Sequence, residues 1–166
     1  MINFHNITKF DMVNGEGIRT VLWLSGCDHA CKGCQNIQTW SHSSGIPFTE
    51  DNLKEIYEEL DKEYISGLTL SGGDPLSLKN REFSLSLAKH LKEKYPHKNI
   101  WCYTGYIFED IKNLDNIEYI DVIVDGKYIQ GFDKIKPQWR GSSNQRIIDV
   151  EQSLQQNEVI LLTIQN

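Results

Sequence analysis

The chain has 166 residues, 39% of them hydrophobic and 24% charged, with a formal net charge of −6. This length and composition fit one globular domain spanning residues 1–166, and they exclude a disordered or fibrous chain. The acidic balance is opposite to the usual basic footprint of a nucleic-acid-binding protein, and no apolar run reaches the roughly 18 residues of a membrane span, so we expect neither kind of partner.

Apolar runs of strand length alternate along the chain with segments of helical periodicity. In chain order we expect a strand at 20–25, a helix at 50–64 with Thr49 as its N-cap, and a strand from 67 into a glycine-rich turn that ends at 75. A helix at 81–95, a strand at 99–105, a short helix at 106–114 and a strand at 118–126 follow. Two further segments lie at 146–156 and 158–164. This alternation predicts right-handed crossovers and a mainly parallel sheet with helices outside.

The number of expected strands limits the fold class. Five or six strands are too few for a closed eight-stranded barrel, which needs about 250 residues. We therefore expect an α/β fold with an open, incomplete (βα) barrel or a doubly wound sheet. Four glycine-containing turns, SGC, SGGDP, YTG and VDG, follow the expected strands. In parallel α/β folds ligands bind beyond the carboxyl ends of the strands, so these turns are expected to form one site.

Three of the four cysteines lie within the eight residues CDHACKGC, at Cys27, Cys31 and Cys34. The first twenty residues lack the apolar stretch of a secretion signal, so we expect metal-binding or catalytic thiols in a reducing cytoplasm rather than disulfides. Thiolates favour iron–sulfur clusters, zinc or copper(I).

A structural zinc site needs a fourth ligand. The candidates are His29, His42 and the distant Cys102. A four-iron cluster held by three thiolates leaves one iron open to a substrate or cofactor. The spacing favours the iron–sulfur cluster, with zinc or unliganded buried thiols as alternatives.

The C-x3-C-x2-C spacing after a first strand, with SGGDP after a later one, resembles the radical S-adenosylmethionine (radical SAM) superfamily. The resemblance implies a radical SAM oxidoreductase on an open half-barrel. It further implies that Cys27, Cys31 and Cys34 hold one 4Fe-4S cluster. The amino and carboxylate groups of SAM would chelate the fourth iron, and reduction would cleave SAM to methionine and a 5′-deoxyadenosyl radical.

Four longer segments narrow the resemblance. The chain is similar to the family of small activating proteins of anaerobic ribonucleoside-triphosphate reductases in four segments taken together: GEGIRTVLWLSGCDHACKGCQNIQTW, GLTLSGGDPL, DVIVDGKY and RGSSNQRIIDV. This resemblance covers nearly the whole chain. It implies generation of a glycyl radical on the large reductase subunit, with a reduced flavodoxin-like or ferredoxin-like protein as electron donor. The alternatives are another glycyl-radical enzyme or a small molecule as substrate, and a non-enzymatic zinc module.

Two short segments are expected to contact SAM. In SGGDP, glycines let a backbone approach a ligand closely and a carboxylate accepts hydrogen bonds from an ammonium group, which suggests Gly72, Gly73 and Asp74. The same turn is also explained by strand-to-helix geometry alone. Many superfamily members carry an aromatic residue before the third cysteine. This chain has glycine there, so we expect backbone contacts from Gly33, Cys34 and Gln35 instead.

Other polar residues have two interpretations each. Arg19 is either a surface arginine of a mobile turn or a partner of a carboxylate or sulfur charge. Cys102, within an apolar strand, is expected to be a core residue because free cysteine is among the most buried residue types. Near the C-terminus, a further set suggests contacts to SAM or to a protein partner, with plain solvation as the alternative: Arg140, Asn144 and Arg146.

Overall fold

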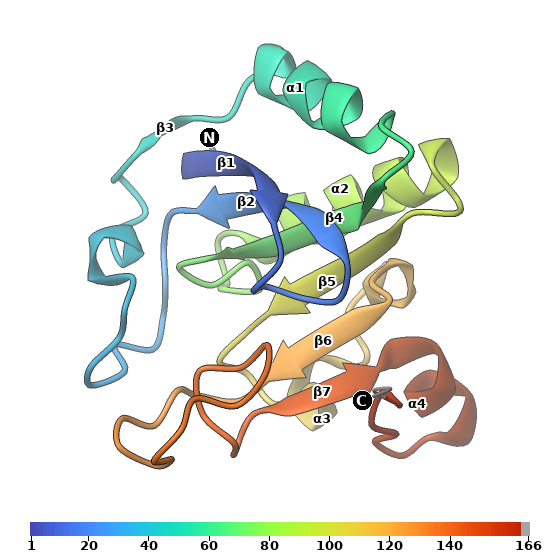
Figure 1. The fold of residues 1–166 in the computed structure, drawn as a ribbon. Coiled ribbons are helices and arrows are strands. Elements are labelled where there is room, and N and C mark those ends of the chain that lie inside the picture. The colour runs from blue at the N-terminus through green and yellow to red at the C-terminus, as the bar shows by residue number, and fades with distance from the viewer. Residues whose placement is uncertain (164–166) are drawn as a thin grey trace.

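The computed structural model describes residues 1–163, which form one seven-stranded sheet with helices against it (Figure 1). The strands are β1 (Asn3–Asp11), β2 (Ile18–Leu24), β3 (Ile46–Pro47), β4 (Ile65–Gly72), β5 (Asn99–Tyr103), β6 (Val122–Asp125) and β7 (Arg146–Asp149). The α-helices are α1 (Glu50–Leu60), α2 (Arg81–Lys94), α3 (Phe108–Ile111) and α4 (Val150–Gln156), and two 3₁₀ turns lie at Ile37–Thr39 and Ile117–Tyr119.

The strand order is β3-β1-β2-β4-β5-β6-β7. The central strands β2, β4, β5 and β6 are parallel, whereas β1, β3 and β7 join antiparallel to their neighbours. Strands β3 and β7 form the two ends of the sheet, which is therefore open (Figure 1). The expected α/β class with an open, mostly parallel sheet is confirmed.

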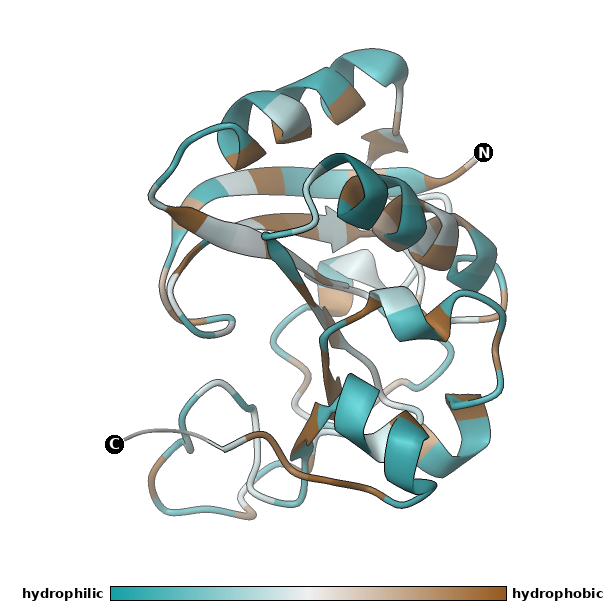
Figure 2. Ribbon diagram, turned by 90° about the vertical axis from the view of Figure 1, so that its right-hand side faces the viewer, coloured by the Kyte–Doolittle hydropathy of each residue, from teal (hydrophilic) through white to brown (hydrophobic). Residues whose placement is uncertain are grey.

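The core lies between the sheet and the helices. Leu68 and Leu70 of β4 are buried together with Ile56 of α1 and with Ala88 and Leu91 of α2. Figure 2 shows the apolar residues, in brown, on the strands and on helix sides that face them. Burying these side chains on one face of each helix is the main stabilising contribution. A second, smaller apolar cluster contains Trp101, Val122, Val124 and Ile147, with Trp139 packed against it.

Helix α1 begins where the sequence predicts. Thr49 is its N-cap, and the Asn52 side chain accepts a hydrogen bond from the Thr49 backbone N–H at 2.8 Å. The segment 146–156 divides at Asp149, whose carboxylate accepts the Gln152 N–H at 3.0 Å and starts α4. Farther on, Leu161 forms a β-bridge with Ile148. The last residue of the predicted apolar segment 158–164 lies outside the described residues.

Strand β1 is absent from the sequence prediction. Its buried residues are Phe4, Ile7 and Asp11, and its pairing with β2 shifts register between Phe4 and Asn6 and again between Thr8 and Asp11. These irregularities break the period of two by which strands are recognised. The sequence of β1 therefore shows no alternation of apolar and polar residues.

No helix in the described part of the chain is long and apolar enough to cross a bilayer.

Candidate metal centre and its cavity

A cavity of about 450 Å³ lies at the carboxyl ends of the parallel strands. All four predicted turns contribute to its wall, through Cys27 after β2, Gly73 after β4, Gly105 after β5 and Gly126 after β6. This volume is in the range of small-molecule sites, roughly 300 to 1,000 Å³. The prediction that the four turns gather at one edge of the sheet is confirmed.

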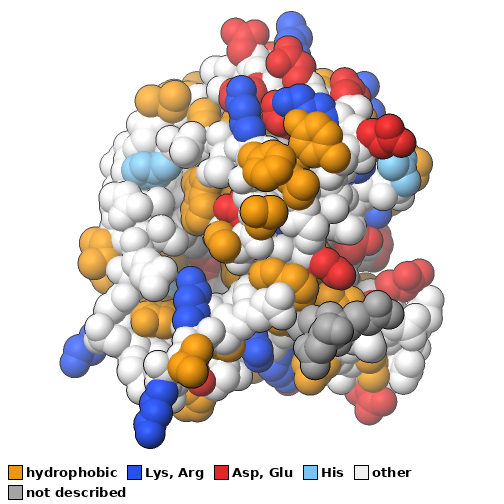
Figure 3. Space-filling view, in the orientation of Figure 1, with side chains coloured by type: hydrophobic (Ala, Val, Ile, Leu, Met, Phe, Trp, Pro, Cys, Tyr) orange, Lys and Arg blue, Asp and Glu red, His pale blue; other side chains and the backbone are white. Residues whose placement is uncertain are grey.

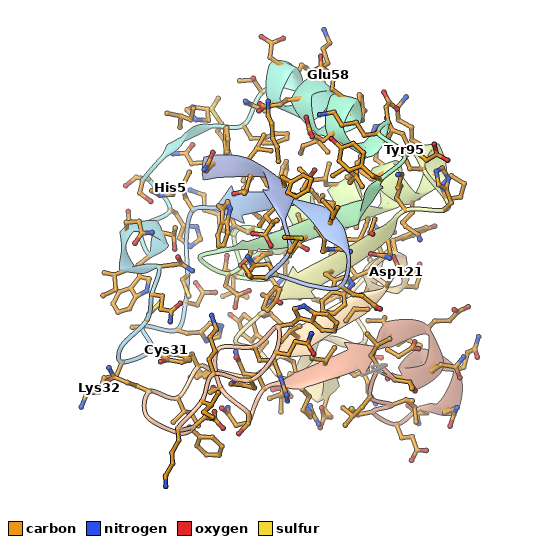
Figure 4. All side chains as sticks on the ribbon, viewed as in Figure 1. His5, Cys31, Lys32, Glu58, Tyr95 and Asp121 are labelled. Carbon is orange, nitrogen blue, oxygen red and sulfur yellow. The ribbon has the colours of Figure 1, made fainter. Side chains whose placement is uncertain are left out.

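Cys27, Cys31 and Cys34 all line this cavity. They lie on the segment 26–36, here called the cysteine loop, which Figure 4 shows around the labelled Cys31. The loop reverses direction with left-handed backbone at Ala30 (φ 55°) and Gly33 (φ 76°). Its ends are anchored, because Gly26 N–H donates to Thr39 O at 2.6 Å and Cys27 N–H to Trp40 O at 3.0 Å.

The donor set fits an iron–sulfur cluster. Three cysteines line one cavity, and Cys34 Sγ accepts a hydrogen bond from Asn36 N–H at 3.4 Å. Among the described residues no three His, Cys, Asp or Glu side chains converge on a single ion. A tetrahedral zinc would need sulfurs about 3.8 Å apart, whereas a cluster binds each thiolate through a different iron.

Burial raises the pKa of the Cys27 thiol to about 11. Ligands bind metal as thiolates, so loading this site releases a proton. Cys102 lies fully buried in β5 and does not border the cavity, and burial raises its pKa well above the ordinary thiol value. The expectation that Cys102 is a core residue is confirmed.

The SGGDP turn touches the cysteine loop closely. Gly73 N–H donates to Leu24 O at 2.9 Å and Asp74 N–H donates to Gly26 O at 2.7 Å. A Cβ on Gly73 would collide with the carbonyl of Gly26, and one on Gly72, which has a φ of 109°, would collide with the backbone of Leu24. Both glycines are therefore required by the protein's own backbone, independently of any ligand.

Asp74 is buried and its carboxylate already has four protein donors. Oδ1 accepts the Leu76 N–H at 2.8 Å. Oδ2 accepts from His29 Nε2 at 2.6 Å, from the Gly105 N–H at 2.9 Å and from the Thr104 hydroxyl at 3.1 Å. The residue thus joins the cysteine loop, the SGGDP turn and the turn after β5. Its side chain organises the site, while its direct contact with SAM stays a prediction.

Five of the six residues predicted to contact SAM line the cavity, namely Cys34, Gln35, Gly72, Gly73 and Asp74. The sixth, Gly33, lies in the cysteine loop outside the lining, next to the side chain of Gln130. Their roles toward SAM stay predictions.

Arg19 matches neither interpretation drawn from the sequence. Its side chain is fully buried, and its nearest partners are Thr69 Oγ1 at 2.7 Å and three backbone carbonyls, of Glu16, Leu68 and Asn99. Its guanidinium lies 5.5 Å from the Trp101 ring centre. Burial lowers its pKa to about 10. Arg19 therefore joins the turn between β1 and β2, through Glu16 O, to β4 and β5.

A part of the cavity wall was not predicted from the sequence. Residues 127–140, between β6 and β7 and here called the flap, line it through several side chains: Tyr128, Lys136, Trp139 and Arg140. Tyr103 of β5 anchors the flap, because its hydroxyl donates to Trp139 O at 2.6 Å. The flap has no strand or helix periodicity, and its aromatic and basic composition is the one sequence signal that could have identified it.

The GSSNQR segment closes the base of the flap. The Gln145 side chain donates to Gly126 O at 2.9 Å and accepts the N–H groups of Gly141 and Ser142 at 2.8 and 3.1 Å, while Asn144 donates to Lys127 O at 2.8 Å. Arg146 binds Asp125 and Glu109, each at 2.6 Å. Of the three polar residues considered from the sequence, only Arg140 lines the cavity.

Residues 13–148 match the family model described as a 4Fe-4S single cluster domain. The geometry and this match together define a protein that carries one iron–sulfur cluster on an open α/β sheet. The zinc alternative is not supported.

Sequence relatives narrow the class further. The anaerobic ribonucleoside-triphosphate reductase-activating protein of Enterobacteria phage T4 is 49% identical over 146 residues, covering 88% of this chain and 93% of that protein. Proteins of the same name from Pasteurella multocida and Escherichia coli K12 are 43% and 40% identical, over 88% and 87% of this chain and 96% of each relative. The chain belongs to the family of anaerobic ribonucleoside-triphosphate reductase-activating proteins, which confirms the resemblance seen in its motifs.

Proposed function

We propose that this protein activates an anaerobic ribonucleoside-triphosphate reductase by removing one hydrogen atom from a glycine Cα of the large subunit. The observation that carries the proposal is the convergence of Cys27, Cys31 and Cys34 on one cavity at the carboxyl edge of an open sheet. The names of its relatives and the 4Fe-4S domain support the same function.

The three cysteines would hold the cluster, with SAM beside it in the cavity. When bound, the reduced cluster supplies the electron that breaks the S–C5′ bond of SAM, giving methionine and the 5′-deoxyadenosyl radical. A reduced flavodoxin-like or ferredoxin-like protein would deliver that electron. Cys34, Gln35, Gly72 and Gly73 would position SAM through the wall they form, with Gly33 supporting the loop behind them.

Asp74 would position rather than react, because His29, Thr104 and the Gly105 N–H occupy its carboxylate. Its contribution is to hold the cysteine loop against the turn after β5. A fixed geometry matters here because a primary radical reacts with whichever donor lies nearest.

The cavity reaches the protein surface, because its lining includes the exposed side chain of Val13. A radical reaction requires the exclusion of water and stray donors. A glycine-bearing segment of the reductase that enters the mouth would complete the enclosure and bring the substrate Cα to the cavity. This argument favours a protein substrate over a small molecule.

The proposal is tested by anaerobic incubation of the cluster-loaded protein with SAM, dithionite and the reductase carrying glycine deuterated at Cα. We expect a glycine-centred radical in the electron paramagnetic resonance spectrum and deuterium in the 5′-deoxyadenosine. Without the reductase, cleavage of SAM should be slow and no stable radical should form. Efficient turnover of a small metabolite, with no deuterium transferred from the reductase, would assign the protein to the small-molecule alternative.

A further inference from the structure

The flap combines positive charge with exposed apolar side chains. Its sequence, KYIQGFDKIKPQWR, contains four basic residues and one acidic residue, a formal net charge of +3 in a chain whose net charge is −6. In Figure 3 Lys and Arg side chains stand out at the lower left, where the flap of Figure 1 and Lys32 of the cysteine loop, labelled in Figure 4, both lie. Within residues 1–163, none of the four basic side chains forms an ion pair. Their charge is therefore available to a partner.

Three apolar side chains of the flap are exposed to solvent: Ile129 (44%), Phe132 (54%) and Ile135 (85%). Exposed apolar groups among basic residues are typical of a protein-binding surface, in which apolar contacts provide affinity and charges provide orientation. They lie on the same segment whose other side chains, Lys136 and Trp139 among them, line the cavity. A molecule bound to the flap would therefore lie beside the cavity mouth.

The flap presents these groups in a fixed arrangement. Gln145 ties together its two ends, at Gly126 and Gly141, and Asp133 Oδ2 accepts the Ser143 N–H at 2.7 Å. The Tyr103 hydroxyl holds the flap near its C-terminal end, through Trp139 O. A surface that is ordered before binding loses less conformational entropy when the partner arrives.

From these observations we propose that the flap is the docking surface for an acidic face of the reductase, next to its glycine-bearing segment. The inference rests on the proposed function and adds to it the place and charge of contact. The overall charge of −6 opposes binding to nucleic acid or to an anionic membrane, whereas a partner protein needs only a local acidic patch. At physiological salt, charges act over about 8 Å, which is enough for contact across an interface.

The test compares two charge-reversal variants of the cluster-loaded protein. Lys127→Glu with Lys134→Glu changes two flap lysines outside the cavity lining, and Lys54→Glu with Lys89→Glu changes the net charge equally on exposed sites of α1 and α2. We expect the flap variant to bind the reductase about tenfold more weakly and to lose salt dependence, and the control to stay within about twofold. Cleavage of SAM by dithionite without reductase should be unchanged in both.

A third variant, Ile135→Asp, tests the apolar part and should also weaken binding. Equal binding by wild type and flap variant, or equal weakening by the flap variant and the control, would overturn the proposal. One further result would also overturn it. The wild type would bind a single-stranded oligonucleotide or phosphatidylserine vesicles, the flap variant would lose that binding, and the flap variant would keep its affinity for the reductase. A different result would contradict the proposed function alone: the wild type would bind the reductase through the flap and produce no glycine-centred radical.

Discussion

The two walls of the cavity are built in different ways. The cysteine loop is anchored at its ends, and between them Cys34 N–H donates to Cys31 O at 3.1 Å. The flap, by contrast, is closed at its base by the Gln145 side chain and is joined to β5 by the Tyr103 hydroxyl, which donates to Trp139 O. The first wall carries the three cysteines and is held through buried Asp74, which binds His29 of the loop. The second wall is held by neutral side chains, those of Gln145 and Tyr103.

This difference separates two functions within one cavity. Binding of a cluster by three thiolates would add the binding free energy of the metal to the stability of the loop that carries them. A wall that meets a partner gains from being ordered beforehand. The following predictions test whether the two walls respond independently.

The largest effect is expected in the cysteine loop. Replacing Cys27, Cys31 or Cys34 by Ala should abolish both iron retention and cleavage of SAM, because each removes one ligand of a three-thiolate site. Iron content, brown absorbance and 5′-deoxyadenosine release measure this. Hydrogen exchange should increase in residues 26–36 and stay unchanged in 127–140.

The matched control is Cys102→Ala, which removes a thiol from the core of β5 and should leave iron and cleavage intact, at a cost of about 1 kcal/mol in the free energy of unfolding. Loss of iron from folded Cys102→Ala protein would contradict the assignment of the ligands.

The second largest effect is expected at Asp74, beneath the cysteine loop. Asp74→Ala leaves buried donors of His29, Thr104 and Gly105 unpaired, so the free energy of unfolding of the iron-free protein should fall by about 3 kcal/mol. Urea denaturation measures this, with the exposed Asp115→Ala as control. An unchanged midpoint for Asp74→Ala would mean that these hydrogen bonds do not organise the site.

A smaller effect is expected from opening the flap. Gln145→Ala removes the three hydrogen bonds that join Gly126 to Gly141 and Ser142, each contributing about 1 kcal/mol. We expect faster hydrogen exchange in residues 127–140 and about tenfold weaker SAM binding, with iron content unchanged. Gln138→Ala, on the exposed flap surface, is the control. Iron loss in Gln145→Ala would show that the walls are coupled.

The smallest effect is a pH dependence at the edge of the flap. The Arg146 guanidinium, through its hydrogen bond, lowers the pKa of Glu109 below its usual 4.5. A lowered carboxyl pKa stabilises the fold above about pH 4.5, and this contribution is lost as the pH falls through the lowered value. Because Glu109 is half exposed, the contribution should not exceed about 0.5 kcal/mol.

Urea midpoints measured from pH 3 to 7 should therefore converge for wild type and Glu109→Gln at the acid end and differ slightly above pH 5. The exposed Glu118→Gln should follow wild type throughout. A difference that grows toward low pH would contradict the sign of the shift.

The sequence predicted those parts of the molecule in which local pattern and structure agree. The parallel strands and α1 and α2 follow apolar runs and helical spacing, and the cysteines lie in the turn where their motif places them. Strand β1 could not be predicted, because its two register shifts remove the alternation of its buried residues. Helix α3 is shorter than predicted, four residues at 108–111.

The cysteines of the site were predicted from the sequence, whereas the residues that hold the site together were predicted less completely. Asp74 was recognised as part of the cavity, yet its donors come from residues 29, 76, 104 and 105, which only folding brings together. The burial of Arg19 likewise depends on β4 and β5, which supply Thr69 and the carbonyl of Asn99. The flap was missed as a wall because irregular segments carry no period from which to read their position.

The two ends of the sheet have a consequence for handling the protein in air. At one end β3 is only two residues long and contains Pro47, which has no N–H to offer a neighbouring strand. At the other end Leu161 bridges to Ile148, and Leu162 N–H donates to Ile147 O at 2.9 Å. Beyond Phe4 the outer side of β1 has no strand partner among residues 1–163, but two register shifts interrupt it, which disfavours pairing with another chain. A molecule that has lost its iron to oxygen should therefore stay dispersed rather than precipitate, and remain competent for repair by reinsertion of a cluster.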